Sequence, residues 1–158
     1  GVSWRIDSGY KTLAADGNYL VITFTTPATG RVFYNFATVN KSGNECIKSL
    51  FEGCTVANGT AVTPVNYNRS ITTACPLTAV KVGLSTDGSP CTITGGTEMF
   101  ISLVPGTAQG NSRPGGSSQL AGVVILKQNT VYALKVMAKG GAATLAADVG
   151  MGYIATAL

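Results

Sequence analysis

The sequence predicts an all-β fold, a single-domain antiparallel β-sandwich or jelly-roll-like barrel with long Gly-rich loops. Apolar and β-branched residues alternate with polar ones over short runs, which is the period of a strand. Turn residues separate these runs at short intervals, with 20 Gly and 6 Pro among 158 residues. Helical periodicity is nearly absent. This length fits one domain, and we divide it into an N-terminal arm at 1–17 and a β-sandwich domain at 18–158.

The first strands are expected at residues 19–25, 31–39 and 47–51. The run YLVITFT at 19–25 alternates and is rich in β-branched and aromatic residues. The segments 27–30 and 40–44 have turn composition, and Gly43 is suited to a positive φ. Short connections predict that these three strands form an antiparallel meander.

The middle of the chain is rich in Thr, Asn and Gly. The dipeptide Asn58-Gly59 predicts a tight turn. Residues 66–73 have no clear period, so we expect an ordered excursion over the surface. Alternation returns at 77–84, and the compact apolar run MFISLV at 99–104 predicts another strand.

The last third of the chain contains a long Gly-rich loop and three predicted strands. The loop at 106–119 is costly to order in isolation, so we expect it to be mobile or ordered by a neighbouring subunit. Segments 120–126 and 131–136 flank a short turn containing Asn129 and predict a hairpin. Residues 143–154 are expected to form a closing strand rather than a helix, because Gly150 and Gly152 break a helix.

The charge of the chain argues against several partners. Charged residues make up 11% of the sequence, against roughly 25% for an average soluble domain. The net charge of +4 comes from scattered basic residues, which form no stripe that would bind nucleic acid. No run of 18 apolar residues predicts a membrane span, and no signal peptide is visible. We therefore expect synthesis in the cytoplasm, with no nucleic-acid or membrane partner.

The four cysteines, Cys46, Cys54, Cys75 and Cys91, leave three readings open. Buried free thiols are the preferred one. Disulfides formed in an oxidising medium are the second, and sequence cannot choose among three complete pairings. An all-thiolate zinc site is the third, although there is no C-x-x-C pair and no histidine.

The acidic residues predict no catalytic site, and we expect no enzymatic activity and no cofactor. There is no histidine to act as a general base, and no two acids are expected close together on one strand face. Asp16 and Asp87 each precede Gly, as turn acids do. Glu52 ends an apolar strand, and we expect it to bind loop amides or to pair with Arg69. Trp4 is read as a partner-facing anchor or as a residue of a disordered arm.

Three blocks of the sequence resemble a known family. The first joins Leu50-Phe51-Glu52-Gly53 to Gly59-Thr60-Ala61 and then to Asn66-x-Asn68-Arg69. The second is I-L-K-x-x-T-x-Y-x-L at 125–134, and the third is the segment 32–36 followed by Gly43. In this order they resemble the head decoration, or cement, proteins of tailed bacteriophages. The chain departs from that pattern in its cysteines and in its ending GMGYIATAL.

The resemblance implies a structural virion protein that binds the outer surface of a phage capsid and cements neighbouring major capsid subunits. It implies a homotrimer, with a dimer as the other option, on the capsid exterior after synthesis in the host bacterium. The alternative is a head-fibre or tail-associated module that binds glycans or the host, and a glycoside-cleaving particle enzyme is a third reading. The family-motif and interface candidates are Trp4, Glu52, Gly53, Gly59, Thr60, Asn66, Asn68, Arg69, Arg113, Lys127 and Tyr132.

Overall fold

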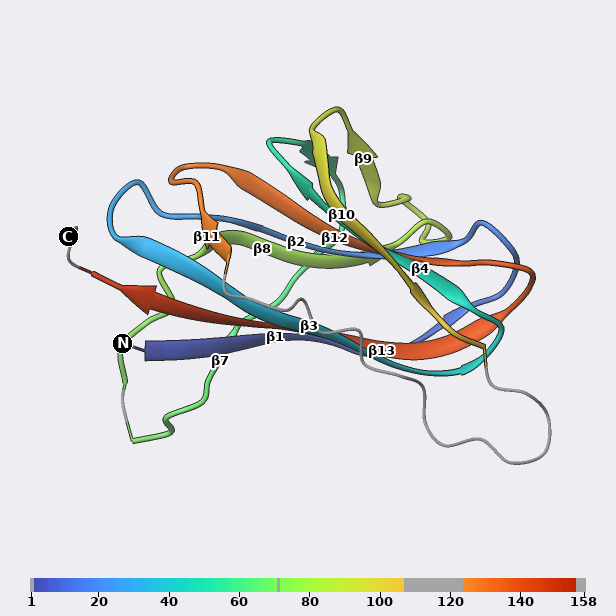
Figure 1. The fold of residues 1–158 in the computed structure, drawn as a ribbon, viewed down its shortest axis with the longest axis horizontal. Coiled ribbons are helices and arrows are strands. Elements are labelled where there is room, and N and C mark those ends of the chain that lie inside the picture. Colours follow the sequence, from blue (N-terminus) through green and yellow to red (C-terminus); the bar gives the residue numbers. More distant parts are fainter. Residues whose placement is uncertain (1, 71, 107–123, 156–158) are drawn as a thin grey trace.

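The computed structural model describes residues 2–70, 72–106 and 124–155, with the backbone alone at residue 36. These residues form thirteen strands and no helix, which confirms the predicted all-β class. Two antiparallel sheets pack face to face as a sandwich (Figure 1). Within the same ranges there is therefore no helix that could cross a membrane.

Sheet A contains five strands in the order β11-β3-β13-β1-β7. Their bounds are β1 Val2–Leu13, β3 Arg31–Gly43, β7 Val65–Asn66, β11 Val124–Leu126 and β13 Ala143–Ile154. The central strand β13 pairs along its length with β3 on one side and β1 on the other. The closing strand predicted at 143–154 is thus confirmed, and it joins the two long strands of this sheet.

Sheet B contains six strands in the order β10-β4-β12-β2-β8-β6. Their bounds are β2 Tyr19–Thr25, β4 Cys46–Glu52, β6 Thr60–Ala61, β8 Thr78–Leu84, β10 Thr97–Val104 and β12 Val131–Ala138. Four of them confirm predicted strands, those at 19–25 and 77–84 from alternation and those at 47–51 and 99–104 from their apolar runs and flanking turns. The pattern therefore located the strands of this sheet well.

A two-stranded sheet of β5 Thr55–Ala57 and β9 Thr92–Thr94 lies against the outer side of sheet B. Val21 and Ala133 alternate with the core-facing residues of β2 and β12, so they point outward from the sandwich. They are nevertheless fully buried, in a small cluster with Cys54 and Cys91. The small sheet thus forms a partial third layer.

The predicted meander of 19–25, 31–39 and 47–51 is wrong. Strands β2 and β4 belong to sheet B, whereas β3 between them belongs to sheet A. The chain therefore crosses from sheet to sheet at each of these turns. Turn residues mark where a strand ends, but they do not fix whether the next strand pairs beside it or in the opposite sheet.

The hairpin predicted from 120–126 and 131–136 is also wrong. The described part of its first segment, β11, pairs with β3 in sheet A, while β12 pairs with β2 and β4 in sheet B. The link at 127–130 crosses from sheet A to sheet B. It is hydrogen-bonded to residues 26–27, where the chain crosses between β2 and β3. Thr26 Oγ1 donates to Lys127 O at 2.6 Å, and Asn129 N donates to Pro27 O at 3.0 Å. The loop expected at 106–119 lies outside the described residues from 107 onward.

The separate N-terminal arm expected at 1–17 is replaced by a strand of sheet A. Strand β1 lies between β13 and β7 and pairs with β13 from Val2↔Tyr153 to Leu13↔Ala143. The side chains of Trp4 and Ile6 on this strand are buried, with 2% and 1% exposure. The alternation that marks this strand is interrupted by a register shift between Asp7 and Tyr10, near Gly9 at φ +62°.

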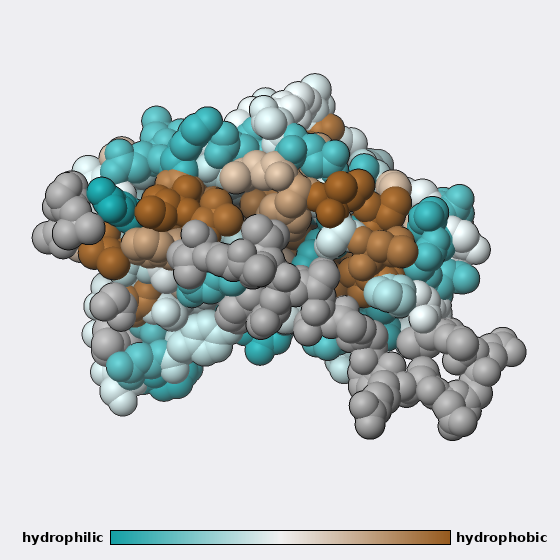
Figure 2. Space-filling model, in the orientation of Figure 1, coloured by the Kyte–Doolittle hydropathy of each residue, from teal (hydrophilic) through white to brown (hydrophobic). Residues whose placement is uncertain are grey.

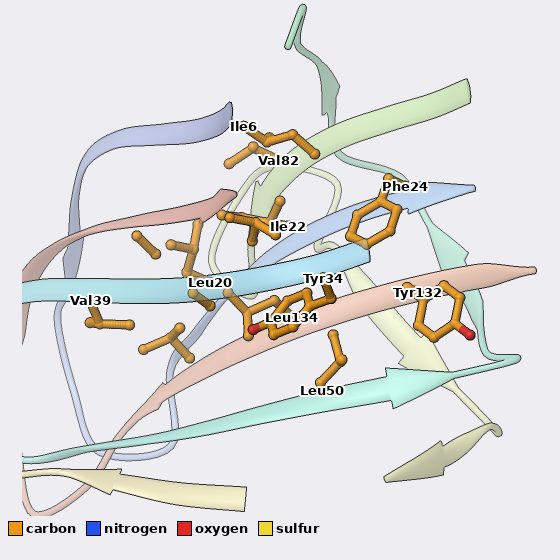
Figure 3. Close-up of a cluster of buried hydrophobic side chains, with 14 of the residues drawn as sticks. Ile6, Leu20, Ile22, Phe24, Tyr34, Val39, Leu50, Val82, Tyr132 and Leu134 are labelled. Carbon is orange, nitrogen blue, oxygen red and sulfur yellow. The ribbon is translucent and has the colours of Figure 1, made fainter. Parts of the chain in front are cut away.

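The main core lies between the two sheets and contains mostly aliphatic side chains with a few large aromatics (Figure 3). The Tyr132 ring stacks on Phe24 with a centroid distance of 5.8 Å. Tyr34 packs against Phe100 at 5.9 Å and so joins β3 to β10 across the sandwich. One cation is also buried there: Lys48 Nζ donates to Ala37 O at 2.8 Å. Burial lowers the pKa of Lys48, because it disfavours the charged form.

Candidate functional site

The structure brings two of the three sequence blocks, at 50–53 and 125–134, together at Glu52. Glu52 ends β4, and Tyr132 lies directly opposite it on β12. The Tyr132 hydroxyl donates to Glu52 Oε2 at 2.7 Å, and Lys127 Nζ lies 2.5 Å from Glu52 Oε1. Lys127 N also donates to the Tyr132 hydroxyl oxygen at 2.8 Å. We call Glu52, Lys127 and Tyr132 the end cluster.

The end cluster joins the two sheets at one end of the sandwich. Tyr132 is fully buried through its ring, whereas its hydroxyl reaches the link that crosses from β11 to β12. In Figure 3 this hydroxyl points away from the other labelled core residues. The Glu52 side chain is 16% exposed and the Lys127 side chain 72% exposed, so only the rim of the cluster is open to solvent.

In the end cluster the negative charge of Glu52 is balanced by the positive charge of Lys127. Hydrogen bonds from Lys127 and then Tyr132 lower the pKa of Glu52, and they outweigh its partial burial. Burial, together with the bond to the Glu52 carboxylate, raises the pKa of Tyr132 well above its ordinary value. Glu52 is therefore held as a carboxylate and Tyr132 as a neutral phenol. Such an arrangement fixes geometry, and it has no group poised to exchange a proton near neutral pH.

The two partners expected for Glu52, loop amides and Arg69, are both wrong. The carboxylate is bound by side chains of β12 and of the preceding link. Gly53 follows with φ +68°, a backbone conformation that favours glycine, and its N donates to Val131 O at 2.8 Å. The Glu-Gly pair therefore has a structural explanation, in which the glycine turns the chain and the glutamate anchors it.

Three other candidates gather at an open hollow beside β1. It is lined by Trp4, Asn66, Arg69, Thr73, Cys75 and Lys81 among others. Trp4 pairs in register with Asn66, and its ring lies 6.3 Å from that of Tyr153. Because Trp4 is only 2% exposed, it is a core residue and is neither a partner-facing anchor nor part of a disordered arm. Arg69 and Lys81 supply the positive charge in the lining of this hollow.

The expected surface excursion at 66–73 is built from side-chain-stabilised turns in its described part. Asn66 Oδ1 accepts from Asn68 N at 2.9 Å, and Asn68 Oδ1 accepts from Ser70 N at 3.1 Å. Tyr67 N donates to Ser3 O at 2.9 Å and ties the segment to β1. Asn66 and Asn68 thus have local structural roles.

Gly59 lies in a tight turn and Thr60 begins β6, next to Ala61 and Lys81 of the hollow beside β1. Asn58 and Gly59 have φ of +62° and +86°, which confirms the predicted turn. Asn58 Nδ2 donates to Pro90 O at 2.9 Å, and Thr60 pairs with Val82 at the edge of sheet B. Asp16 and Asp87 lie in turns, as predicted, and accept from Gly140 N and Leu84 N, both at 2.8 Å. Arg113 lies outside the described residues.

One charged group of sheet A was not foreseen. Asp7 and Asp148 lie directly opposite each other on the neighbouring strands β1 and β13, a pairing across two strands that the expectation for single strand faces did not cover. Arg5 Nη2 contacts both carboxylates, at 2.9 Å and 3.4 Å. Thr38 donates to Asp148 from β3. The shared guanidinium balances the two negative charges and joins neighbouring strands. Only the register of the sheet could have revealed this pairing.

The four cysteines are free thiols, and two of them, Cys54 and Cys91, belong to the small cluster on the outer side of sheet B. Cys54 and Cys91 flank opposite ends of the β5–β9 ladder, which runs from Thr55↔Thr94 to Ala57↔Thr92. The ladder keeps them farther apart than a disulfide can span. Cys46 begins β4, and Cys75 lines the hollow beside Trp4. Among the described residues, no group of three His, Cys, Asp or Glu side chains could hold a metal ion.

Comparisons with known proteins returned no match to a protein-family model, to a curated protein or to a solved structure.

Proposed function

We propose that the chain is a structural virion protein that binds the outer surface of a phage capsid and cements neighbouring major capsid subunits. The observation that carries the proposal is the end cluster. The sequence blocks at 50–53 and 125–134, which bear the resemblance to phage head decoration proteins, meet there through Glu52, Lys127 and Tyr132. The two blocks therefore form one structural unit, which supports the interpretation that they are parts of a single motif.

The surface chemistry supports adhesion. Charged residues are scarce, and the net charge of +4 favours approach to an acidic shell. Several large apolar side chains are exposed, including Ile101 at 62% and Ile125 at 55%. A rigid sandwich with such a surface is suited to permanent contacts with neighbours. In this proposal the partners are the major capsid protein and further copies of the chain, with a homotrimer as the arrangement that the resemblance implies.

Particle stability tests the proposal. Purified chain is added to capsids that lack it, and bound protein is measured after sedimentation together with the temperature at which the capsids rupture. Binding with a raised rupture temperature is expected, because a ligand that binds the intact shell stabilises it by mass action. A Glu52→Ala, Lys127→Ala variant that still folds serves as a probe of the end cluster. Absence of binding, or binding with an unchanged rupture temperature, would contradict cementing.

A head-fibre or tail-associated glycan module remains the second proposal. The hollow beside β1 favours it, because Arg69 and Thr73 place polar side chains in its lining that a sugar could contact. The buried ring of Trp4 cannot serve there as a stacking platform. A glycan array probed with the intact chain and with Arg69→Ala separates the two proposals. Loss of a specific glycan signal in Arg69→Ala would support the second.

A further inference from the structure

Strand β10 is the exception among the edge strands of the sandwich. Within the described part of the chain, sheet A ends in β11 and β7, with three and two residues, and the other edge of sheet B is β6, with two. Strand β10 has eight residues, and no other described strand lies beyond it in sheet B. Proteins usually keep such edges short or guard them with charges or proline, because long edges pair with other chains. Only Glu98 supplies a charge on β10.

The outward face of β10 carries a row of exposed apolar side chains. Met99, Ile101 and Leu103 are 37%, 62% and 50% exposed, while Phe100, Ser102 and Val104 alternate with them toward the core. Ile125 of β11, at the edge of the opposite sheet, is also exposed, at 55%. Figure 2 shows hydrophobic residues gathered along the face where β10 and β11 lie.

The geometry of β10 defines a short window suited to pairing. A register shift makes Met99 an extra residue between Glu98 and Phe100, so the regular part of the ladder with β4 runs over residues 100–104. Pro105 follows and has no amide hydrogen to donate. The midpoint of this five-residue window is Ser102. Ile101 and Leu103 lie on either side of it, one residue away in each direction.

We propose that a second copy of this chain pairs antiparallel with residues 100–104 of β10, about a twofold axis at Ser102. In that register Ile101 lies opposite Leu103 of the partner subunit, and Leu103 lies opposite Ile101 of the partner subunit. Two apolar cross-strand pairs form, which stabilise antiparallel sheets. An isologous contact requires a surface that matches itself, and this window does.

The charges of β10 favour a second copy over a charged partner. The window contains no ionisable residue, so it offers nothing to select an acidic or basic segment. Glu98 lies outside it, and the two Glu98 carboxylates are kept at opposite ends of the paired strands. The contact is twofold and therefore separate from the threefold contact that the resemblance to decoration proteins implies. It goes beyond the proposed capsid function, since it requires no capsid.

Charge reversal tests the pairing. Ile101→Lys with Leu103→Lys places lysine opposite lysine twice, and Ile101→Glu with Leu103→Glu does the same with glutamates. Each variant alone is expected to have half the mass of the unmodified chain by light scattering, because like charges directly opposite each other are destabilising. An equimolar mixture of the two variants should restore the full mass. If the chain also forms trimers, the mass falls from hexamer to trimer by the same factor of two.

The control places Lys at two exposed apolar positions remote from β10, Val65→Lys with Ile154→Lys, and should keep the full mass. Circular dichroism and the unfolding transition establish that every variant is folded. Should the charged variants fail to fold, single Ile101→Cys and Leu103→Cys variants replace them. Their mixture should form disulfide-linked dimers much faster than Tyr10→Cys does. An unchanged mass on charge reversal, no recovery in the mixture, or equal cross-linking at Tyr10→Cys would overturn the proposal.

Discussion

Tyr132 and Glu52 face each other across neighbouring strands of sheet B, and the phenol donates a 2.7 Å hydrogen bond to the carboxylate. The same phenol oxygen accepts from the backbone of Lys127 in the link that crosses the sandwich. A single hydroxyl thus connects β4, β12 and the path from sheet A to sheet B. Removing this hydroxyl therefore affects both strands and the link, although only one oxygen atom is lost.

Tyr132→Phe is expected to lower the free energy of unfolding by about 1–3 kcal/mol, because it leaves polar groups at a partly buried site without their partner. The stacked ring on Phe24 is kept, so no cavity forms in the core. Urea unfolding measures the change. Tyr153→Phe is the matched control: its hydroxyl makes one long, exposed contact of 3.4 Å to Thr29 O. Equal effects of the two changes would contradict the structural role of the end cluster.

Trp4 tests the strand that replaces the expected N-terminal arm. Trp4→Ala should destabilise the protein by about 3–5 kcal/mol, since it empties a large buried site. An arm residue would have no such effect. Tyr10→Ala on the same strand removes a ring that is 85% exposed and should change stability by less than about 0.5 kcal/mol. Thermal unfolding of the two variants compares them directly.

The sequence located most strands but not their sheets. Alternation at 19–25 and 77–84 identifies a strand from its own side chains, so the prediction needed no partner. Whether β3 pairs with β2 or with β13 depends on contacts over a hundred residues away in the chain. For the same reason Lys127 could not be assigned to Glu52 in advance. Trp4 was missed because Gly9 and a register shift interrupt the pattern of β1.

Substitution of two turn glycines, Gly53 and Gly30, is expected to lower the stability of the protein by different amounts. At Gly53, with φ +68° and nothing within 4 Å of an added Cβ, Gly53→Ala should cost only the left-handed backbone, about 1–2 kcal/mol. At Gly30, with φ +76°, the added Cβ would lie 2.6 Å from the Tyr153 ring and 2.7 Å from Ile154 O. Gly30→Ala therefore adds a steric clash to the same backbone cost. Chemical unfolding should rank Gly30→Ala as clearly the more destabilising, and the reverse order would contradict the packing of β13 against this turn.

Thiol labelling distinguishes free cysteines from disulfides. Burial raises the pKa of each of the four, and three are buried while Cys75 is half-buried. At neutral pH the folded protein should therefore react with a thiol reagent at Cys75 alone, and the denatured protein at all four. Mass spectrometry of labelled peptides identifies the sites. A count of two or none in denaturant without reductant would show disulfides instead.

Acid should weaken the end cluster in a predictable pH range. The pKa of Glu52 is lowered on folding from its ordinary value of 4.5, so the unfolded chain takes up a proton at that position first as the pH falls. The stability that Glu52 contributes is fully present above about pH 4.5 and is lost as the pH falls through the lower folded-state pKa. Glu52→Gln keeps the shape and an oxygen that can accept from Tyr132, but it does not titrate. The difference in unfolding free energy between the unmodified chain and Glu52→Gln should be constant near neutral pH and should shrink below about pH 4.5, as measured by urea unfolding over a pH series. A difference that stays constant down to the lowest pH at which both proteins fold would show that the carboxylate is not held by Lys127 and Tyr132.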